Sequence, residues 1–282
     1  MGHKLCFGTG VFYNVPVTEQ MKYIKDAGFD MVFSDWDGRH FDFEPVARAA
    51  ADAGLALHSI HAPFYACDDI WEDDEGNRAG VFMQALRGCI DDCVRFGVGL
   101  MISHVIIGME RCTPNELGLE RFGEIIDYAA DRGITIAFEN TEGEEYLKAV
   151  LDRYGGRENV GFCYDSGHEL CYNAGRDMLA NYGRYILSTH LNDNLGMLDP
   201  ANKTYLDDSH LLPFDGIADW EGIAARLHGC GFDSTLTFET CSSSKPGRTA
   251  NDRYAGLTFE EYLAAAYERA ARFRDIFEKG EI

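Results

Sequence analysis

Short apolar runs alternate with longer amphipathic stretches along the whole chain. The runs are rich in β-branched and aromatic residues, which is typical of buried strands, and the stretches between them have helical spacing. Strands are predicted over residues 4–9, 30–34, 56–60, 100–103, 134–138, 160–164, 185–189 and 234–238, and helices over 18–27, 43–53, 77–96, 113–132, 144–154, 177–181, 220–228 and 258–279. Eight strand–helix alternations predict an α/β fold, a (β/α)₈ barrel in which residues 1–282 form a single domain.

Local signals place some of the boundaries. Thr18 is expected to cap the first helix, and Thr113, followed by a proline, the fourth. The segment at about 192–216 lacks a helical pattern and is interpreted as a loop insertion. An ordered loop of that length indicates a functional role. An open, doubly wound sheet is less well supported, because no glycine-rich nucleotide motif follows the first strand.

Composition and charge narrow the class of function. The chain has 282 residues and a net charge of −22, which disfavours nucleic acid as a partner. No apolar run approaches the roughly 18 residues of a membrane span, and the N-terminus lacks a signal-peptide layout, so we expect no membrane partner and a cytoplasmic location. The nine cysteines show no framework spacing, which fits thiols in a reducing compartment.

Four successive strands each end in a side chain that can bind a metal. Glu139, Asp165, His190 and Glu239 follow the fifth to eighth predicted strands. Because the carboxyl ends of barrel strands meet at one rim, we expect these groups to lie together. Three carboxylates and one imidazole suit one divalent ion of Mn, Co, Mg or Zn.

Further polar and aromatic residues fall near the same rim. His61 and His104 follow the third and fourth strands, and His168 and His210 lie in loops after the sixth and seventh. Trp36 and Phe64, in loops after the second and third strands, are candidate pocket walls. We predict that these six residues contact the substrate.

This set of groups suggests a reaction. A divalent ion with open positions could bind two neighbouring oxygens of a hydroxy-ketone and stabilise the enediolate formed when an adjacent C–H loses its proton. Glu139 and Glu239 are then candidates for the base that removes this proton and the acid that returns it.

The strand endings resemble those of the xylose isomerase-like TIM-barrel superfamily, and most closely its sugar phosphate isomerase/epimerase group of ketose 3-epimerases and inosose isomerases or dehydratases. The motifs are Phe-Glu-Asn at 138–140, Asp-Ser-Gly-His at 165–168, Thr-His-Leu-Asn-Asp at 189–193, Phe-Glu-Thr at 238–240 and the stretch 210–220. The resemblance covers nearly the whole chain. It implies a metal-dependent isomerase or epimerase of a small sugar, sugar acid or cyclitol, and commonly a homo-oligomer.

Carried over to this chain, the resemblance makes Glu139, Asp165, His190 and Glu239 the metal ligands and His168 a substrate contact. One feature departs from it. The epimerases carry an arginine shortly after the histidine of the seventh strand, whereas residues 192–194 are Asn-Asp-Asn. The serine run that ends at Lys245 leaves a phosphorylated substrate open.

Two alternatives remain at this stage. Apurinic endonucleases share the barrel and bind three zinc ions through nine ligands, which can be traced here as His61, His104, Glu139, Asp165, His168, His190, Asp208, His210 and Glu239. The acidic charge and the absence of an arginine-rich loop oppose that activity. An inosose dehydratase, a lyase, begins with the same enediolate chemistry and stays open.

Overall fold

The computed structural model describes residues 2–10, 12–36, 42–73, 76–110 and 113–280. Within these ranges eight parallel strands form one sheet in the order β7-β6-β5-β4-β3-β2-β1-β8, so that strands adjacent in sequence are adjacent in space. They are β1 (Leu5–Gly8), β2 (Met31–Asp35), β3 (Ala56–His61), β4 (Leu100–Ser103), β5 (Thr135–Glu139), β6 (Val160–Asp165), β7 (Ile186–His190) and β8 (Leu236–Phe238).

The two end strands meet and nearly close the sheet. The Leu191 amide donates to the Thr237 carbonyl at 2.8 Å, and the Glu239 amide donates to the Leu191 carbonyl at 3.2 Å. Leu191 and Phe238 form a parallel bridge between these segments. The predicted (β/α)₈ barrel is therefore confirmed.

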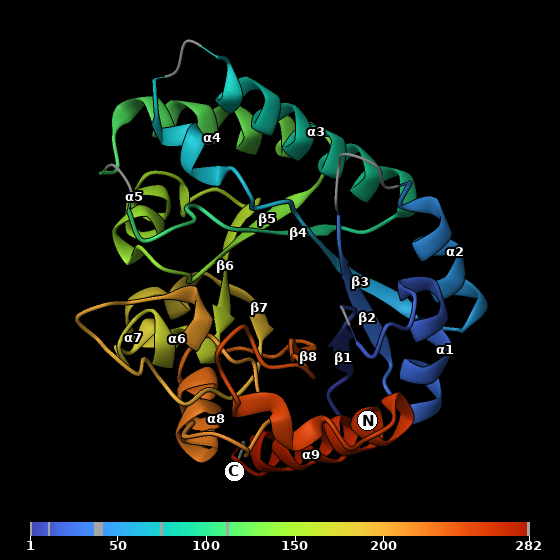
Figure 1. Cartoon of the computed structure of the whole chain (residues 1–282). Helices are drawn as coiled ribbons and strands as arrows, with labels where there is room; N and C mark the ends of the chain where they lie inside the picture. The colour runs from blue at the N-terminus through green and yellow to red at the C-terminus, as the bar shows by residue number, and fades with distance from the viewer. Residues whose placement is uncertain (1, 11, 37–41, 74–75, 111–112, 281–282) are drawn as a thin grey trace.

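Helices surround the strands on the outside of the barrel (Figure 1). They are α1 (Val17–Ala27), α2 (Glu44–Asp52), α3 (Arg78–Phe96), α4 (Glu116–Ala130), α5 (Glu144–Tyr154), α6 (Ser166–Cys171), α7 (Met178–Tyr182), α8 (Trp220–Gly229) and α9 (Phe259–Lys279), with 3₁₀ turns η1 (Cys67–Trp71), η2 (Gly183–Tyr185), η3 (Tyr205–Asp207) and η4 (Ala250–Tyr254). Among the described residues, no helix has the length and apolarity to cross a membrane.

The closing helix α9 is fixed to the barrel by its N-terminal cap and by the packing of its inner face. Its capping box joins Thr258 and Glu261, which satisfies amide groups that the first turn leaves unpaired. Phe273, fully buried on its inner face, packs 5.1 Å from the ring of Trp220 on α8 and 6.3 Å from that of Phe238 on β8. Burying such a ring contributes on the order of 1.5–3 kcal/mol, so packing rather than helix propensity holds the helix in place.

Two predicted helix caps are wrong. The first helix begins at Val17 after Pro16 rather than with a Thr18 cap. The fourth is capped by Asn115, whose Oδ1 accepts from the Gly118 amide at 2.9 Å, and not by Thr113. Asn115 also donates to the Trp71 carbonyl at 2.8 Å, which fixes the helix start to η1. A threonine two residues earlier cannot make that tertiary contact.

The sequence prediction also missed α6, which starts directly after β6. Asp165 caps this helix by accepting from the His168 amide at 2.6 Å. Its six residues include Gly167, a poor helix former, so no periodic signal revealed it. The turn brings His168 back toward the strand ends. The predicted insertion contains η3 among irregular segments.

The structure describes eight of the nine cysteines. Eight are free of disulfide bonds, and the ninth, Cys112, lies outside the described residues. Cys89 and Cys93 face each other one turn apart on α3, where burial raises the pKa of the Cys89 thiol well above its usual value. A buried neutral thiol packs like a small apolar side chain.

Candidate active site

The structure brings the four strand-end groups together at one end of the barrel. Glu139, Asp165 and His190 are the last residues of β5, β6 and β7, and Glu239 immediately follows β8. One potential ligand atom from each lies within 4.8 Å of the others. The His190 Nδ1 atom is 3.1 Å from Glu139 Oε2 and 3.0 Å from Glu239 Oε2. We call these four residues the strand-end quartet.

Two members of the quartet carry polar atoms without satisfied hydrogen bonds. Glu139 and His190 are completely buried. Within the described part of the chain, neither carboxylate oxygen of Glu139 and neither ring nitrogen of His190 makes a hydrogen bond of standard geometry. Buried polar atoms of this kind are costly and rare. A divalent cation among the quartet would coordinate them, so the residues fit a metal ion by position and by chemistry.

Two asparagines hold Asp165 in place, Asn140 through its backbone and Asn192 through its carboxylate. The Asn140 amide donates to the Asp165 carbonyl at 2.9 Å, and its oxygen accepts from the Asp165 amide at 2.8 Å. Asn192 donates to Asp165 Oδ2 at 2.8 Å. Both asparagines are fully buried. Such supporting hydrogen bonds orient a ligand before the metal arrives.

His61 and His104 approach the quartet from β3 and β4. The Nε2 atoms of His61 and His104 lie 3.4 Å and 3.7 Å from Glu139 Oε2. The Nδ1 atom of His61 is 2.8 Å from the Ala62 carbonyl, and donation to that carbonyl leaves Nε2 free to accept or to ligate. The two histidines thus extend the same group of ligands.

His168, Asp208 and His210 form a second group beside the quartet. Asp208 Oδ2 lies 3.5 Å from His168 Nε2 and 3.0 Å from His210 Nε2. His168 Nδ1 is 3.1 Å from Glu139 Oε1. His210 adopts a left-handed backbone with φ of 44°, a strained conformation for a residue other than glycine. The Nδ1 atom of its ring lies 4.0 Å from Glu239 Oε2 of the quartet.

Charges within the two groups alter their pKa values. Burial opposes ionisation of Glu239, but the facing His190 lowers its pKa to about 2. For Asp165, burial dominates and raises the pKa to about 6, with His168 and His210 partly offsetting it. Burial lowers the pKa of His104 to about 3 despite the nearby Glu139. A neutral His104 can accept a hydrogen bond or coordinate a cation.

A cavity of about 740 Å³ opens above these groups. Glu239 faces it with 27% of its side chain exposed, whereas Glu139 lies wholly beneath. Of the predicted substrate contacts, the cavity is lined by His61, Phe64, His104, His168 and His210. Trp36 is not among its described lining residues; its indole donates instead to Asp92 on α3 at 2.7 Å. We therefore leave Trp36 out of the site.

The sequence analysis missed several residues that line the cavity. Asp35 ends β2 just as Glu139 ends β5, and the same strand-end signal could have identified it. Its side chain is exposed to the cavity, and desolvation by the surrounding protein raises the pKa of its carboxyl group. Glu142, Tyr172 and Tyr205 carry no such signal, because none of them ends a strand: Glu142 lies between β5 and α5, Tyr172 follows α6, and Tyr205 lies in η3.

Lys245 is the one cation among the described residues that line this cavity. Its Nζ atom is 3.1 Å from Asp208 Oδ2 and donates to the Tyr205 carbonyl at 3.0 Å. It thus ties the loop after β8 to the insertion after β7. Lys203, the first cation that follows residues 192–194 in sequence, instead donates to the Tyr172 carbonyl at 3.3 Å.

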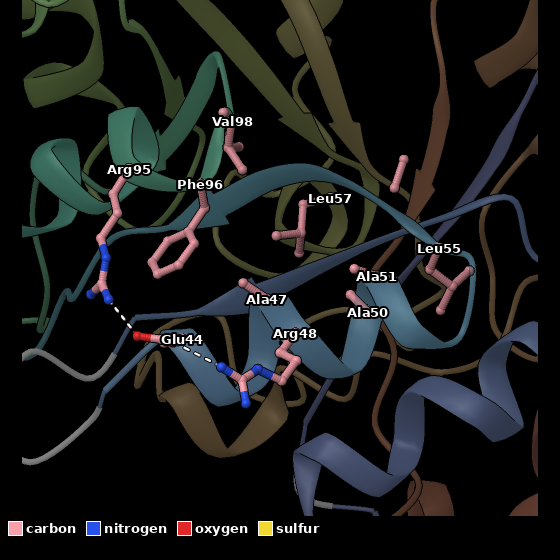
Figure 2. A pocket seen from close by; sticks show the side chains of 12 residues that line it. Glu44, Ala47, Arg48, Ala50, Ala51, Leu55, Leu57, Arg95, Phe96 and Val98 are labelled. Atoms are coloured by element: carbon pink, nitrogen blue, oxygen red, sulfur yellow. Dashed lines mark hydrogen bonds and ion pairs between the residues drawn. The ribbon is translucent and has the colours of Figure 1, made fainter.

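A second cavity, of about 680 Å³, lies between α2, α3 and the start of β3. Figure 2 shows its walls of alanine and leucine, with Glu44 paired to Arg95 and Arg48 at its edge. No group of metal-ligating side chains found among the described residues includes any of its lining residues. The first cavity is therefore the candidate active site.

Comparison with known proteins identifies the class of protein that has this site. The family model for the xylose isomerase-like TIM barrel matches residues 21–259. The chain belongs to that family, as the strand-end motifs predicted.

Particular relatives are more distant. The uncharacterised protein y4fM of Sinorhizobium fredii is 27% identical, over 92% of this chain and 94% of that protein. The structure of an L-ribulose 3-epimerase is similar with a TM-score of 0.70 and 17% identity, over 99% of this chain and 96% of the other. That of 3-keto-D-glucoside 4-epimerase from E. coli has a TM-score of 0.68 and 15% identity, over 97% and 99%. At these identities the structural likeness shows the shared fold.

Proposed function

We propose that this protein is a divalent-metal-dependent isomerase or epimerase of a small sugar, sugar acid or cyclitol ketone. The observation that carries the proposal is the unsatisfied, fully buried pair Glu139 and His190 within the strand-end quartet, directly beneath a large cavity. The likeness to two sugar epimerases supports the substrate class. Such a protein acts on a small molecule and needs no nucleic acid or membrane partner.

The quartet of Glu139, Asp165, His190 and Glu239 would hold the metal ion. When bound, the ion supplies positive charge that acidifies a C–H next to the substrate carbonyl and stabilises the resulting enediolate. Its carboxylate-rich ligands suit Mn, Mg, Co or Zn. Asn192 keeps the Asp165 carboxylate oriented for this role, and Asn140 fixes the backbone that carries it.

Proton transfer falls to the two glutamates. Glu239 is the quartet carboxylate that faces the cavity, so it is placed to take a proton from a bound hydroxy-ketone. Glu139, whose Oε2 atom also lies 3.1 Å from His190 Nδ1, is its partner as acid. His61, His104, His168 and His210 line the cavity and can hydrogen-bond the substrate hydroxyls. Phe64, stacked on the ring of His104 at 4.8 Å, limits access of water from that side.

One alternative has a specific observation in its favour. The quartet, the pair His61 and His104, and the group around Asp208 resemble the three ligand sets of a trinuclear zinc phosphodiesterase.

A dehydratase would share the enediolate and differ in the later loss of a hydroxyl.

Elemental analysis of protein purified without added metal separates these candidates. We expect about one divalent ion per chain, together with solvent deuterium entering a ketose at the carbon next to its carbonyl. Three zinc ions per chain and cleavage of an abasic duplex would instead establish the phosphodiesterase. Loss of a hydroxyl from an inosose would establish the lyase.

The catalytic pair is tested by replacing each glutamate with glutamine. For Glu139→Gln and Glu239→Gln we expect deuterium exchange to fall roughly 10²–10⁴-fold, because a glutamine amide can neither take up nor return the transferred proton. The control is Glu145→Gln, exposed on α5, which should exchange like the unmodified protein. Metal content is measured for each variant. Unchanged exchange in either variant with metal bound would contradict the assignment.

A further inference from the structure

A cysteine lies beside the strand-end quartet, inside the barrel. Cys163 is two residues before Asp165 on β6, and side chains two residues apart on a strand point to the same face of the sheet. Cys163 is also the register partner of Glu139 on β5. Its side chain is completely buried and forms a small cluster with Ile102 and Ala137. The thiol therefore lies one pleat deeper in the barrel than the Asp165 carboxylate.

This thiol belongs to a second set of potential metal ligands. One ligand atom each from Glu139, Cys163 and His190 lies within 4.8 Å of the others, and all three residues are fully buried. In a tetrahedral zinc site, with bonds of roughly 2.0–2.3 Å, ligand atoms lie about 3.5 Å apart. Small adjustments of the three side chains would thus let one ion contact all of them. We call these residues the deep trio.

Two members of the deep trio carry polar atoms that point independently to a ligand. In the described part of the chain, both carboxylate oxygens of Glu139 and both ring nitrogens of His190 lack a hydrogen bond of standard geometry. The His190 ring stacks on Phe33, with centroids 4.7 Å apart, and on His61 at 5.8 Å. This stacking limits rotation of the ring. Glu139 and His190 are thus held, without partners, beside a sulfur atom.

The deep trio and the quartet suit different ions. The quartet offers three carboxylates and one imidazole, a set of ligands that favours Mn²⁺ or Mg²⁺. The deep trio has one carboxylate, one imidazole and one thiol, and thiolate sulfur favours softer ions such as Zn²⁺. Cysteine binds a metal as the thiolate, so the S–H proton passes to solvent as the metal–sulfur bond forms.

We propose that the deep trio of Glu139, Cys163 and His190 is a binding site for the thiophilic divalent ions Zn²⁺ and Cd²⁺, and that it competes with the quartet. Because Glu139 and His190 belong to both sets, an ion in one set excludes an ion from the other. This gives one ion per chain in either case.

The consequence for catalysis rests on the proposed function and narrows its metal. None of the three residues of the deep trio lines the cavity, whereas Glu239 of the quartet does. An ion in the deep trio therefore offers a substrate no open position. Thiophilic ions occupy the protein without supporting exchange, and the harder Mn²⁺ or Mg²⁺ in the quartet supports it.

Ultraviolet absorption tests the deep trio independently of activity. A thiolate bonded to Cd²⁺ has a charge-transfer band that carboxylate and imidazole ligands do not give. Chelator-treated protein is titrated with Cd²⁺, and we expect the band to rise and saturate at one ion per chain. When Mn²⁺-loaded protein is titrated in the same way, Mn²⁺ should be released in proportion to the band, as measured by electron paramagnetic resonance.

Two variants assign the band to Cys163. Cys163→Ser and Cys163→Ala should abolish it and weaken Cd²⁺ binding at least about tenfold, because even the loss of a group that only supports a ligand costs roughly 10–100-fold in affinity. Their Mn²⁺ affinity should stay close to that of the unmodified protein. The control is Cys6→Ser on β1, a fully buried strand cysteine in none of the ligand groups found among the described residues, which should keep the band. The Mn²⁺ competition uses the unmodified protein, so it decides the inference even if a substitution at Cys163 prevents folding.

The outcomes separate this inference from the proposed function. A Cd²⁺ complex without the band, a band that persists in Cys163→Ser, or a band that rises while Mn²⁺ stays bound would overturn the inference, whether or not a ketose exchanges its proton. The band with release of Mn²⁺, but no exchange of any ketose or inosose by the Mn²⁺-loaded protein, would keep the deep trio and count against the proposed reaction. Where exchange is observed, the Cd²⁺-loaded protein should be at least about tenfold slower than the Mn²⁺-loaded one, and equal rates would overturn the competition.

Discussion

Asp35 shows how much a single residue at the rim can contribute to specificity. Its carboxylate lines the cavity and has no hydrogen-bond or ion-pair partner among the described residues. The pKa of Asp35 is raised, first by desolvation and then by the charges of Glu239 and Glu139, while His61 opposes the rise. An unpaired group in a binding cavity is available to a substrate hydroxyl.

Replacing this residue tests its effect on charge selection. In Asp35→Asn one negative charge leaves the cavity while the side-chain volume is kept. We expect a sugar phosphate to bind roughly 3–10-fold more tightly, relative to the free sugar, than it binds to the unmodified protein, because a like charge in the cavity is lost. Calorimetry with both compounds measures it. The exposed Asp233→Asn is the control, and an unchanged difference in Asp35→Asn would show that this carboxylate takes no part in selection.

Individual residues also show what could be read from the sequence. Glu139, Asp165, His190 and Glu239 were predicted to meet because each ends a buried run, and parallel strands bring their ends to one rim. The pairing of Lys245 with Asp208 carries no such local signal, since it joins two irregular loops 37 residues apart. Its formation depends on the path of both loops across the barrel end.

For the helices and strands, the hydrophobic pattern predicted the type and order of the elements well. It predicted the residues at which they begin and end less well. The fifth predicted helix has the bounds observed for α5 (Glu144–Tyr154), where apolar positions repeat on one face. The sequence did not predict α6, because tertiary hydrogen bonds define this helix rather than a periodic pattern of apolar residues. The cap of α4 was misplaced because the deciding contact comes from η1.

The contact between α4 and η1 leads to a prediction about stability. A Cβ atom at Gly118 would lie 2.0 Å from Cε3 of Trp71, whose indole is buried and donates to the Val105 carbonyl. Alanine normally favours a helix over glycine by about 1 kcal/mol. Here the steric overlap with Trp71 should outweigh this helix preference. We therefore expect Gly118→Ala to lower the free energy of unfolding by roughly 1–3 kcal/mol.

Urea unfolding measures this change, with Gly99→Ala as the control. No atom lies within 4 Å of a Cβ placed at Gly99, so that variant should unfold within about 0.5 kcal/mol of the unmodified protein. If Gly118→Ala is instead more stable, Trp71 can move aside and η1 is not rigidly packed against α4.

For the whole molecule, the histidine His58 makes stability depend on pH. Burial lowers its pKa in the folded state to about 4, with a smaller effect from His190. An unfolded histidine takes up its proton near pH 6.5. As the pH falls from about 6.5 to 4, the unfolded chain binds more protons than the folded one. The free energy of unfolding therefore decreases over that window, by up to about 3 kcal/mol from this group.

The variant His58→Gln should remove that contribution. Chemical unfolding of both proteins at several pH values, in matched metal-free buffer, should show their stabilities diverging below pH 6.5, with the unmodified protein losing more. The solvent-facing substitution Arg48→Gln serves as the control and should follow the unmodified protein. Parallel curves for His58→Gln and the unmodified protein would mean that His58 is protonated in the folded state as readily as in the unfolded one.

A metal ion at the strand ends would join four of the eight strands, so its removal should affect the stability of the whole barrel. The quartet comes from β5, β6, β7 and the residue after β8, which includes the β7–β8 junction where the sheet closes through Leu191. A ligand present at 100 times its dissociation constant stabilises the folded state by about 2.7 kcal/mol. Adding Mn²⁺ to chelator-treated protein should therefore raise Tm by about 5 °C or more.

Asp165→Asn, which weakens the site and keeps its shape, should lose most of this rise, whereas Asp177→Asn on the outside should keep it. An equal rise in all three proteins would place the stabilising ion elsewhere.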